Sequence, residues 1–196
     1  MKEKMMGITI GMLVLLFMPM YAPAVTWNVT NGILMGANDV NVNGQFYNVE
    51  FRDGTCVALY GGCNSLNDFM FQTQITATAA AQALLDQVLI NGSQGQFDDY
   101  PELTNGVTNT GGDAIGTPYA IDSFGNVEMM AALNYPYLHN NWDAVIGPTW
   151  TGGLDDLTRN SVWGYAVWQQ VPEPATMLLL GLGLMGLVGI RRKLKN

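Results

Sequence analysis

The chain has 196 residues, of which 48% are hydrophobic and only 12% are charged, and its formal net charge is −8. Six of its eight Lys and Arg residues lie among the first four or the last six positions, so residues 25–170 carry fourteen acidic side chains against two Arg, a net charge of −12. Such an acidic surface repels nucleic acid and anionic lipid, which excludes nucleic-acid-binding functions. It also repels acidic polysaccharide, unless divalent cations bridge the protein and the polymer.

The N-terminus predicts a secretory signal peptide over residues 1–24. Lys2 and Lys4 precede an uncharged apolar stretch, and Ala22 and Ala24 then form an A-x-A site. We therefore expect signal peptidase to cleave after Ala24. The alternative interpretation is a membrane anchor that is retained.

The first part of the exported domain, residues 25–170, predicts strands and hairpins. Asn43-Gly44 is typical of a two-residue hairpin turn. Beyond it, Tyr47 and Phe51 belong to a run in which apolar and polar residues alternate, so we expect one buried face. The expected strands, in chain order, lie at 27–35, 40–42, 47–52, 55–60 and 69–75.

One helix is predicted over residues 76–89, which are rich in Ala and end in several Leu and Val residues. Thr76 or Thr78 is expected to cap its start, and Asn91-Gly92 its end. Its Ala-rich face predicts close packing onto a sheet.

The second part of the domain predicts looser structure with fewer strands. In chain order we expect a long surface loop at 92–116, a hairpin of 119–122 and 127–133 around the turn 123–126, a loop-rich segment at 134–153 and a last strand at 161–168. The expected fold class is α+β, with a mainly antiparallel sheet and one principal helix. A 146-residue domain is long enough to bury a core of its own.

Cys56 and Cys63 are the only cysteines of the chain. In an exported domain, two cysteines with six residues between them predict a disulfide. A zinc site would need two further ligands of the usual kind, and the chain contains a single His.

Residues 39–50 fit the calcium-loop pattern D-x-[DN]-x-[DN]-G-x5-E, with Asp39 at the first position and Glu50 at the last. Both flanks predict strands instead of helices, and Asn43-Gly44 is equally well explained as a hairpin turn. Calcium binding by this segment stays open, and no metal ligand is assigned. The other acidic positions are interpreted as solvated turn residues with at most weak divalent binding, namely Asp98, Asp99, Asp113, Asp155 and Asp156.

The sequence predicts no catalytic residue and no cofactor. His139 is the only His, and no G-x-S-x-G or other nucleophile motif accompanies it. Trp142 and Trp150 fall in predicted loops rich in Asn and Asp, where aromatic faces can hold neutral sugars. The alternative for these tryptophans is packing in the core.

The C-terminal residues predict a single transmembrane helix over 175–190. Sixteen uncharged residues span roughly 24 Å as a helix, somewhat less than the bilayer core of about 30 Å, and local thinning of the bilayer can accommodate the difference. A basic cluster follows and is expected to remain cytoplasmic, formed by Arg191, Arg192, Lys193 and Lys195. A buried core helix is the alternative.

Residues 171–196 resemble the PEP-CTERM sorting signal of Gram-negative bacteria. The resemblance rests on Pro172, Glu173 and Pro174, followed by the apolar helix and the basic end. It implies processing by exosortase, a membrane protease-transpeptidase, after anchoring in the inner membrane. It also implies a final location at the cell surface or outside the cell, in a bacterium that makes extracellular polysaccharide.

Together these features predict an exported, non-catalytic protein of the cell envelope or extracellular matrix, structural or adhesive and associated with exopolysaccharide. Two alternatives remain open. One is a glycan-binding module that uses Trp142 or Trp150, and the other is an extracytoplasmic hydrolase that uses His139.

Overall fold

The structure is a computed structural model that describes residues 24–136, 142–157 and 162–172. The predicted transmembrane helix, and all of the predicted signal peptide except Ala24, lie outside the described residues. None of the helices in the described part has the length and apolar character needed to cross a membrane.

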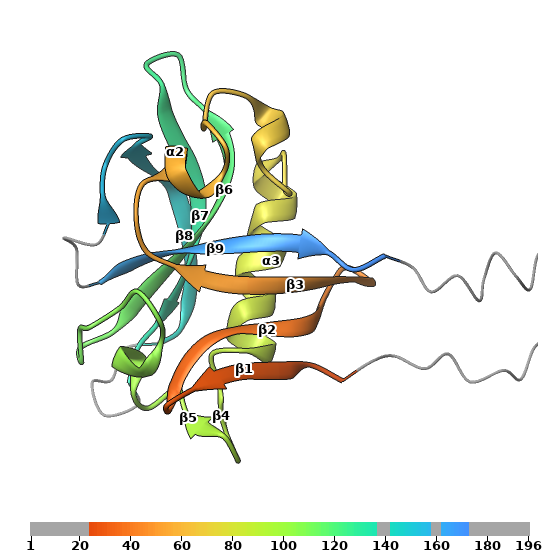
Figure 1. Cartoon of the computed structure of the whole chain (residues 1–196), viewed down its shortest axis with the longest axis vertical. Coiled ribbons are helices and arrows are strands. Elements are labelled where there is room, and N and C mark those ends of the chain that lie inside the picture. Colours follow the sequence, from red (N-terminus) through yellow and green to blue (C-terminus); the bar gives the residue numbers. More distant parts are fainter. Residues whose placement is uncertain (1–23, 137–141, 158–161, 173–196) are drawn as a thin grey trace, which may run out of the picture.

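A seven-stranded sheet forms the centre of the domain, in the order β1-β2-β3-β9-β6-β7-β8 (Figure 1). Its strands are β1 Thr26–Thr30, β2 Ile33–Val42, β3 Gln45–Arg52, β6 Asp113–Ile121, β7 Asn126–Asn134, β8 Ala144–Gly152 and β9 Trp163–Gln170. Neighbouring strands are antiparallel, except that β6 and β9 are parallel. The described residues therefore confirm the predicted α+β class with a mainly antiparallel sheet.

The principal helix α3, Gln74–Gln87, crosses one face of the sheet (Figure 1). It begins two residues earlier than predicted because Thr73, instead of Thr76 or Thr78, is the N-cap, and its hydroxyl accepts a hydrogen bond of 3.2 Å from the Thr76 N–H. Small side chains bring the helix close to the strands, since Ala77, Ala80 and Ala81 are fully buried. The predicted packing of an Ala-rich face onto a sheet is confirmed.

The sheet buries apolar side chains on both faces, because successive residues of a strand point to opposite sides. On β7, Met130 and Ala132 contribute to the core beneath α3, whereas Val127 and Met129 contribute to the core on the other face. That second core is completed by residues from outside the sheet, together with β9, and contains Cys56, Cys63, Phe69, Leu157 and Tyr165.

The first two hairpins of the sheet each contain an Asn-Gly turn, of which one was predicted from the sequence. The predicted turn at Asn43-Gly44 joins β2 to β3, and both residues have positive φ, 53° and 87°. The expected single strand at 27–35 is wrong, because Asn31-Gly32 forms an equivalent turn with φ of 53° and 82° and divides it into β1 and β2. The β-prone residues on both sides of Asn31-Gly32 concealed this second Asn-Gly pair.

The strands expected at 55–60 and 69–75 are also wrong. Residues Cys56–Leu59 form the single-turn helix α2, capped by Thr55, and Leu66–Asp68 form the 3₁₀ helix η1. Phe69 and Phe71 are buried in the irregular segment that leads into α3. These aromatic residues are buried in the core without belonging to a strand. In the sequence, such buried aromatics look the same as those of a strand.

The second half is more regular than predicted. The expected loop at 92–116 contains the short strands β4 Asn91–Gly92 and β5 Gly95–Gln96 and the 3₁₀ helix η2 Pro101–Leu103, and β6 already begins at position 113. The expected loop at 134–153 contains β8. This strand lies at the edge of the sheet. Pro148 has no backbone N–H to donate to a neighbouring strand, and an edge strand tolerates this.

The predicted turn at 123–126 and the predicted last strand are confirmed as the β6–β7 hairpin and β9. The last strand is displaced by two residues toward the C-terminus, since it ends at Gln170. The start of β1 and the end of β9 lie at the same side of the molecule (Figure 1). The Val171 N–H still donates to the Phe46 carbonyl over 2.9 Å, so the fold holds the chain up to this point.

Candidate functional site

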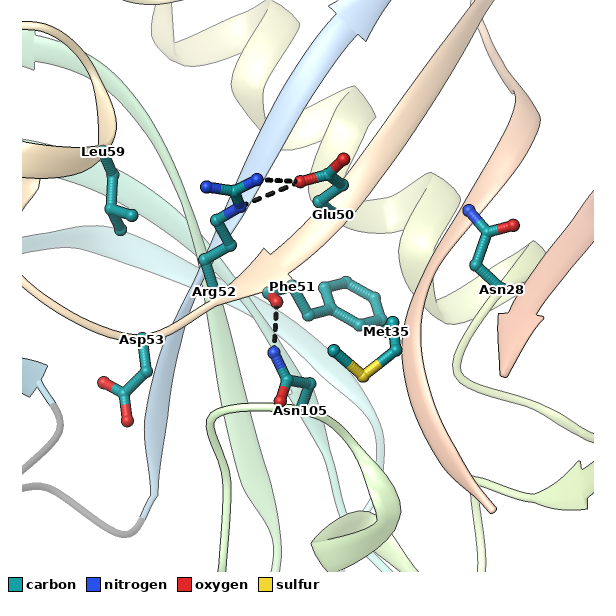
Figure 2. A pocket seen from close by; sticks show the side chains of 8 residues that line it. All are labelled: Asn28, Met35, Glu50, Phe51, Arg52, Asp53, Leu59 and Asn105. Atoms are coloured by element: carbon teal, nitrogen blue, oxygen red, sulfur yellow. Dashed lines mark hydrogen bonds and ion pairs between the residues drawn. The ribbon is translucent and has the colours of Figure 1, made fainter. Parts of the chain in front are cut away.

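A groove of about 630 Å³ opens on the side of the sheet opposite α3, beside β3 (Figure 2). Val49 and Phe51 point into the core beneath α3, so their neighbours Glu50 and Arg52 point to the opposite side. The groove is lined by Asn28, Met35, Glu50, Phe51, Arg52, Asp53, Leu59 and Asn105.

The polar groups of the groove are partly paired with one another. Arg52, the single cation among the described residues, donates from Nε to Glu50 Oε2 over 2.8 Å. Asn105 Nδ2 donates to the Phe51 carbonyl over 2.7 Å. Desolvation raises the pKa of Asp53, the Gly54 N–H offsets part of this rise, and the charge of Asp156 adds to it.

These groups can donate and accept hydrogen bonds around an apolar floor of Met35 and Leu59. The lining contains no Ser, Cys or His, so it offers binding groups without an activated nucleophile of these types. The groove was missed by sequence reasoning because its residues come from β1, β2, β3, the helix α2 and two loops, which are distant from one another in the chain.

Trp142 and Trp150, the candidates for sugar contact, are 86% and 61% exposed. Trp150 lies on the edge strand β8, not in the loop that was expected, and Trp142 lies two residues before this strand. Trp142 and Trp150 are eight positions apart in the chain, which corresponds to at most roughly 26 Å of fully extended chain. They lie at the opposite edge of the sheet from the groove.

The other three tryptophans pack against the rest of the domain. Trp27 donates from its indole N–H to the Gln87 carbonyl over 3.1 Å and packs edge-on against Phe97. Trp168 is 7% exposed in the core beneath α3, and Trp163 packs against the core on the other face. Only Trp142 and Trp150 thus present their rings widely to solvent.

The structure joins Cys56 to Cys63, with their Cα atoms 5.9 Å apart. Cys56 begins α2, and both sulfurs belong to the core on the sheet face opposite α3. The disulfide thereby holds the irregular segment against β7 and β9.

Residues 39–50 form a β-hairpin and not a calcium loop between helices. Asn41 Oδ1 accepts a hydrogen bond of 2.8 Å from the Gly44 N–H within the turn, and Glu50 faces Arg52 in the groove. Within the described ranges, no three His, Cys, Asp or Glu side chains converge closely enough to hold a metal ion.

Asp113 was interpreted as a solvated turn residue, and this is wrong. It is the first residue of β6 and is only 1% exposed. Burial raises the pKa of its carboxyl well above the ordinary value, the Thr104 hydroxyl and nearby backbone groups oppose the rise, and the charge of Asp143 adds to it. No local signal distinguishes this Asp from a turn residue.

Several predicted positions fall outside the described residues, namely Ala22, His139, Glu173, Pro174, Arg191, Arg192, Lys193 and Lys195. Pro172 lies two residues after the end of β9. The comparison with protein families matches residues 170–193 to the PEP-CTERM protein-sorting motif. The chain carries a PEP-CTERM sorting signal.

The PEP-CTERM signal marks a protein that is exported, is anchored through its C-terminal signal and is sorted by exosortase to the cell surface. Because β9 ends at Gln170, the signal starts where the folded domain ends. No curated protein and no solved structure matches the chain.

Proposed function

We propose that this PEP-CTERM protein is a non-catalytic, adhesive component of the cell surface that contacts exopolysaccharide. The observation that carries the proposal is the exposure of two large aromatic rings, Trp142 and Trp150, close to the two ends of one edge strand. An aromatic ring left in solvent gains free energy when the apolar face of a sugar covers it.

The placement of the two tryptophans near the two ends of β8 favours a long polymer over a single sugar. A chain that covers both rings makes the second contact intramolecularly, so two weak contacts give a much higher overall affinity. The net charge of −12 on residues 25–170 disfavours acidic polymers. The preferred ligand is therefore a neutral polysaccharide, or an acidic one whose charge is balanced by divalent cations.

The binding half of the proposal is tested by co-sedimentation of the full chain, in detergent, with insoluble neutral polysaccharides. We expect Trp142→Ala and Trp150→Ala each to weaken retention about three- to tenfold, since each removes roughly 0.5–1.5 kcal/mol of aromatic contact. Ile75→Ala is the matched control, because Ile75 is an apolar side chain that is 80% exposed and lies on the helix α3 instead of on β8. Undiminished retention of the double Trp variant would reject the role of these rings.

The sorting half is tested by deleting residues 172–196 and fractionating the cells into membrane, surface and medium. We expect the deletion to change the distribution of the protein, because the PEP-CTERM signal spans residues 170–193. An unchanged distribution would contradict sorting through this signal.

The non-catalytic part of the proposal is tested with a broad screen of hydrolase substrates. We expect the wild type and His139→Asn to be equally inactive. Turnover by the wild type that His139→Asn abolishes would instead favour the hydrolase alternative.

A further inference from the structure

Three of the four buried polar side chains in the described residues lie together. They are Thr104, Asp113 and Asn134, each no more than 1% exposed, and we call them the Asp113 cluster. The fourth, Thr117, lies elsewhere on β6 and is satisfied, since its hydroxyl accepts a hydrogen bond of 3.1 Å from the Trp168 indole. The Asp113 cluster is therefore the main concentration of polar atoms inside the domain.

The strands place these side chains next to one another. Asp113 opens β6 and is the direct antiparallel partner of Asn134 at the end of β7. Thr104 follows η2, and its hydroxyl lies near enough to influence the Asp113 carboxyl. Asn134 Nδ2 donates to the Phe97 carbonyl over 2.8 Å, which fixes the orientation of the amide.

The oxygens of the Asp113 cluster are poorly paired, because the Thr104 hydroxyl and the Asn134 backbone N–H make only weak contacts with the Asp113 carboxyl. Both carboxylate oxygens of Asp113, Oδ1 of Asn134 and Oγ1 of Thr104 are buried without a well-formed hydrogen bond to any described residue. An unpaired buried carboxylate costs several kcal/mol, so proteins neutralise such groups with a proton, a cation or a metal ion. The charged neighbours are acidic, because Asp143 interacts with Asp113, and Asp98 with Asp143.

We propose that the Asp113 cluster binds a hard divalent cation, for which calcium is the best fit. The carboxylate of Asp113 supplies the charge, Asn134 Oδ1 and Thr104 Oγ1 supply neutral oxygens, and water completes the coordination. Calcium accepts six to eight oxygen ligands in irregular geometry, whereas zinc prefers nitrogen and sulfur, which this cluster does not offer.

The surrounding residues support entry of a cation from solvent. Asp143 is exposed and Asp98 half-buried, and the charge of Asp143 acts on Asp113, so the negative potential of this region attracts cations. Because one carboxylate alone belongs to the cluster, the expected dissociation constant is in the range of extracellular calcium modules, about 10⁻⁴–10⁻³ M. This site is independent of the proposed contact between tryptophans and polysaccharide.

The test uses the full chain, purified in detergent and stripped with EDTA, in calorimetric titration and thermal unfolding with CaCl₂ up to about 10 mM. We expect saturable heat and a rise in Tm of roughly 3–8 °C. NaCl at equal ionic strength should leave Tm unchanged. Asp113→Asn should abolish both responses, whereas Asp86→Asn, which removes an equal charge from the exposed face of α3, should retain them.

Thr104→Val provides a second variant in case Asp113→Asn does not fold, since it removes one oxygen and keeps the shape of the side chain. It should fold and bind calcium at least about threefold more weakly than the wild type. Absence of heat from the wild type at 10 mM calcium would overturn the proposal. An equal rise in Tm for the wild type and Asp113→Asn would overturn it as well.

Discussion

At the scale of single residues, burial decides the chemistry of this domain more than residue type does. Asp113 and Asp122 have the same side chain and lie at opposite ends of the strand β6 and its following turn. Burial raises the pKa of Asp113. Desolvation acts to raise the pKa of Asp122, but the hydrogen bonds that Asn126, Phe124 and Gly125 donate to its carboxylate together outweigh it, so the pKa is lowered.

The raised pKa of Asp113 predicts that stability falls as pH rises in metal-free buffer. The folded state retains a proton that the unfolded chain loses near pH 3.9, so the contribution is complete below that pH and is lost as pH rises through the folded-state pKa. Urea denaturation between pH 4 and 8 should show this decline, with a limiting slope of about 1.4 kcal/mol per pH unit for one proton.

Asp113→Asn should show a shallower decline in the free energy of unfolding over the same pH range. Part of the slope should remain, because desolvation also raises the pKa of Asp98, Asp143 and Asp53. Identical slopes for the variant and the wild type would contradict the assignment of the proton to Asp113.

A second effect of burial at the residue scale is steric, and a glycine on β2 illustrates it. Gly36 has a φ of 147°, and a Cβ at this position would collide with the Val49 carbonyl on β3. Gly36→Ala should therefore destabilise the domain by more than about 2 kcal/mol. Gly32→Ala is the matched control, because Gly32 also has positive φ but faces open space, and it should cost only about 1–2 kcal/mol. Equal losses in urea denaturation would argue against the collision.

At the scale of elements, each segment is determined by the combination of its local signals and its partners. The helix α3 has both, since Thr73 caps its start and its Ala face fits the sheet. The edge strand β8 has weak local signals, with Gly147 and Pro148 in its middle, and exists because β7 provides a ladder for it. The element α2 depends on Thr55 and on the bond from Cys56 to Cys63.

The helix cap can be tested directly. Thr73→Ala should lower the free energy of unfolding by about 1 kcal/mol, because the Thr76 N–H loses its hydrogen bond at the start of α3. Thr78→Ala should change it by only a few tenths of a kcal/mol, because Thr78 is inside the helix and Ala is a better helix former. Chemical denaturation of both variants measures the difference. A larger loss for Thr78→Ala would show that the cap is wrongly assigned.

At the scale of the whole molecule, the sorting signal, the groove and the exposed tryptophans lie at three different places around the sheet. The start of β1 and the end of β9 lie together on one side, so the PEP-CTERM signal leaves the domain there (Figure 1). The groove lies beside β3, whereas Trp150 lies on β8 at the other edge of the sheet. A polymer bound at the tryptophans would leave the groove and the C-terminal signal accessible.

This arrangement predicts that the domain folds without its sorting signal. A chain that ends at Val171 keeps the hydrogen bond from Val171 to Phe46 and every described strand. Its Tm should lie within about 2 °C of that of the full chain, measured by circular dichroism in the same detergent. A large loss of stability would mean that residues beyond Val171 are part of the fold.

The sequence by itself determined the sorting signal, the turn at Asn43-Gly44, the helix near residues 74–87 and the alternation in β3. These features depend on residues within one turn, one strand or one linear motif, so neighbouring positions are sufficient to specify them. The family comparison confirms the sorting signal on the same grounds.

Only the tertiary structure decided the burial of Asp113, the exposure of Trp150, the strand β8 and the helix α2. Asp113 is buried because Asn134, Thr104 and Phe97 approach it from other segments, and no pattern around position 113 records their approach. Burial is a property of contacts between segments distant in the chain, and the groove and the Asp113 cluster exist only once those contacts have formed.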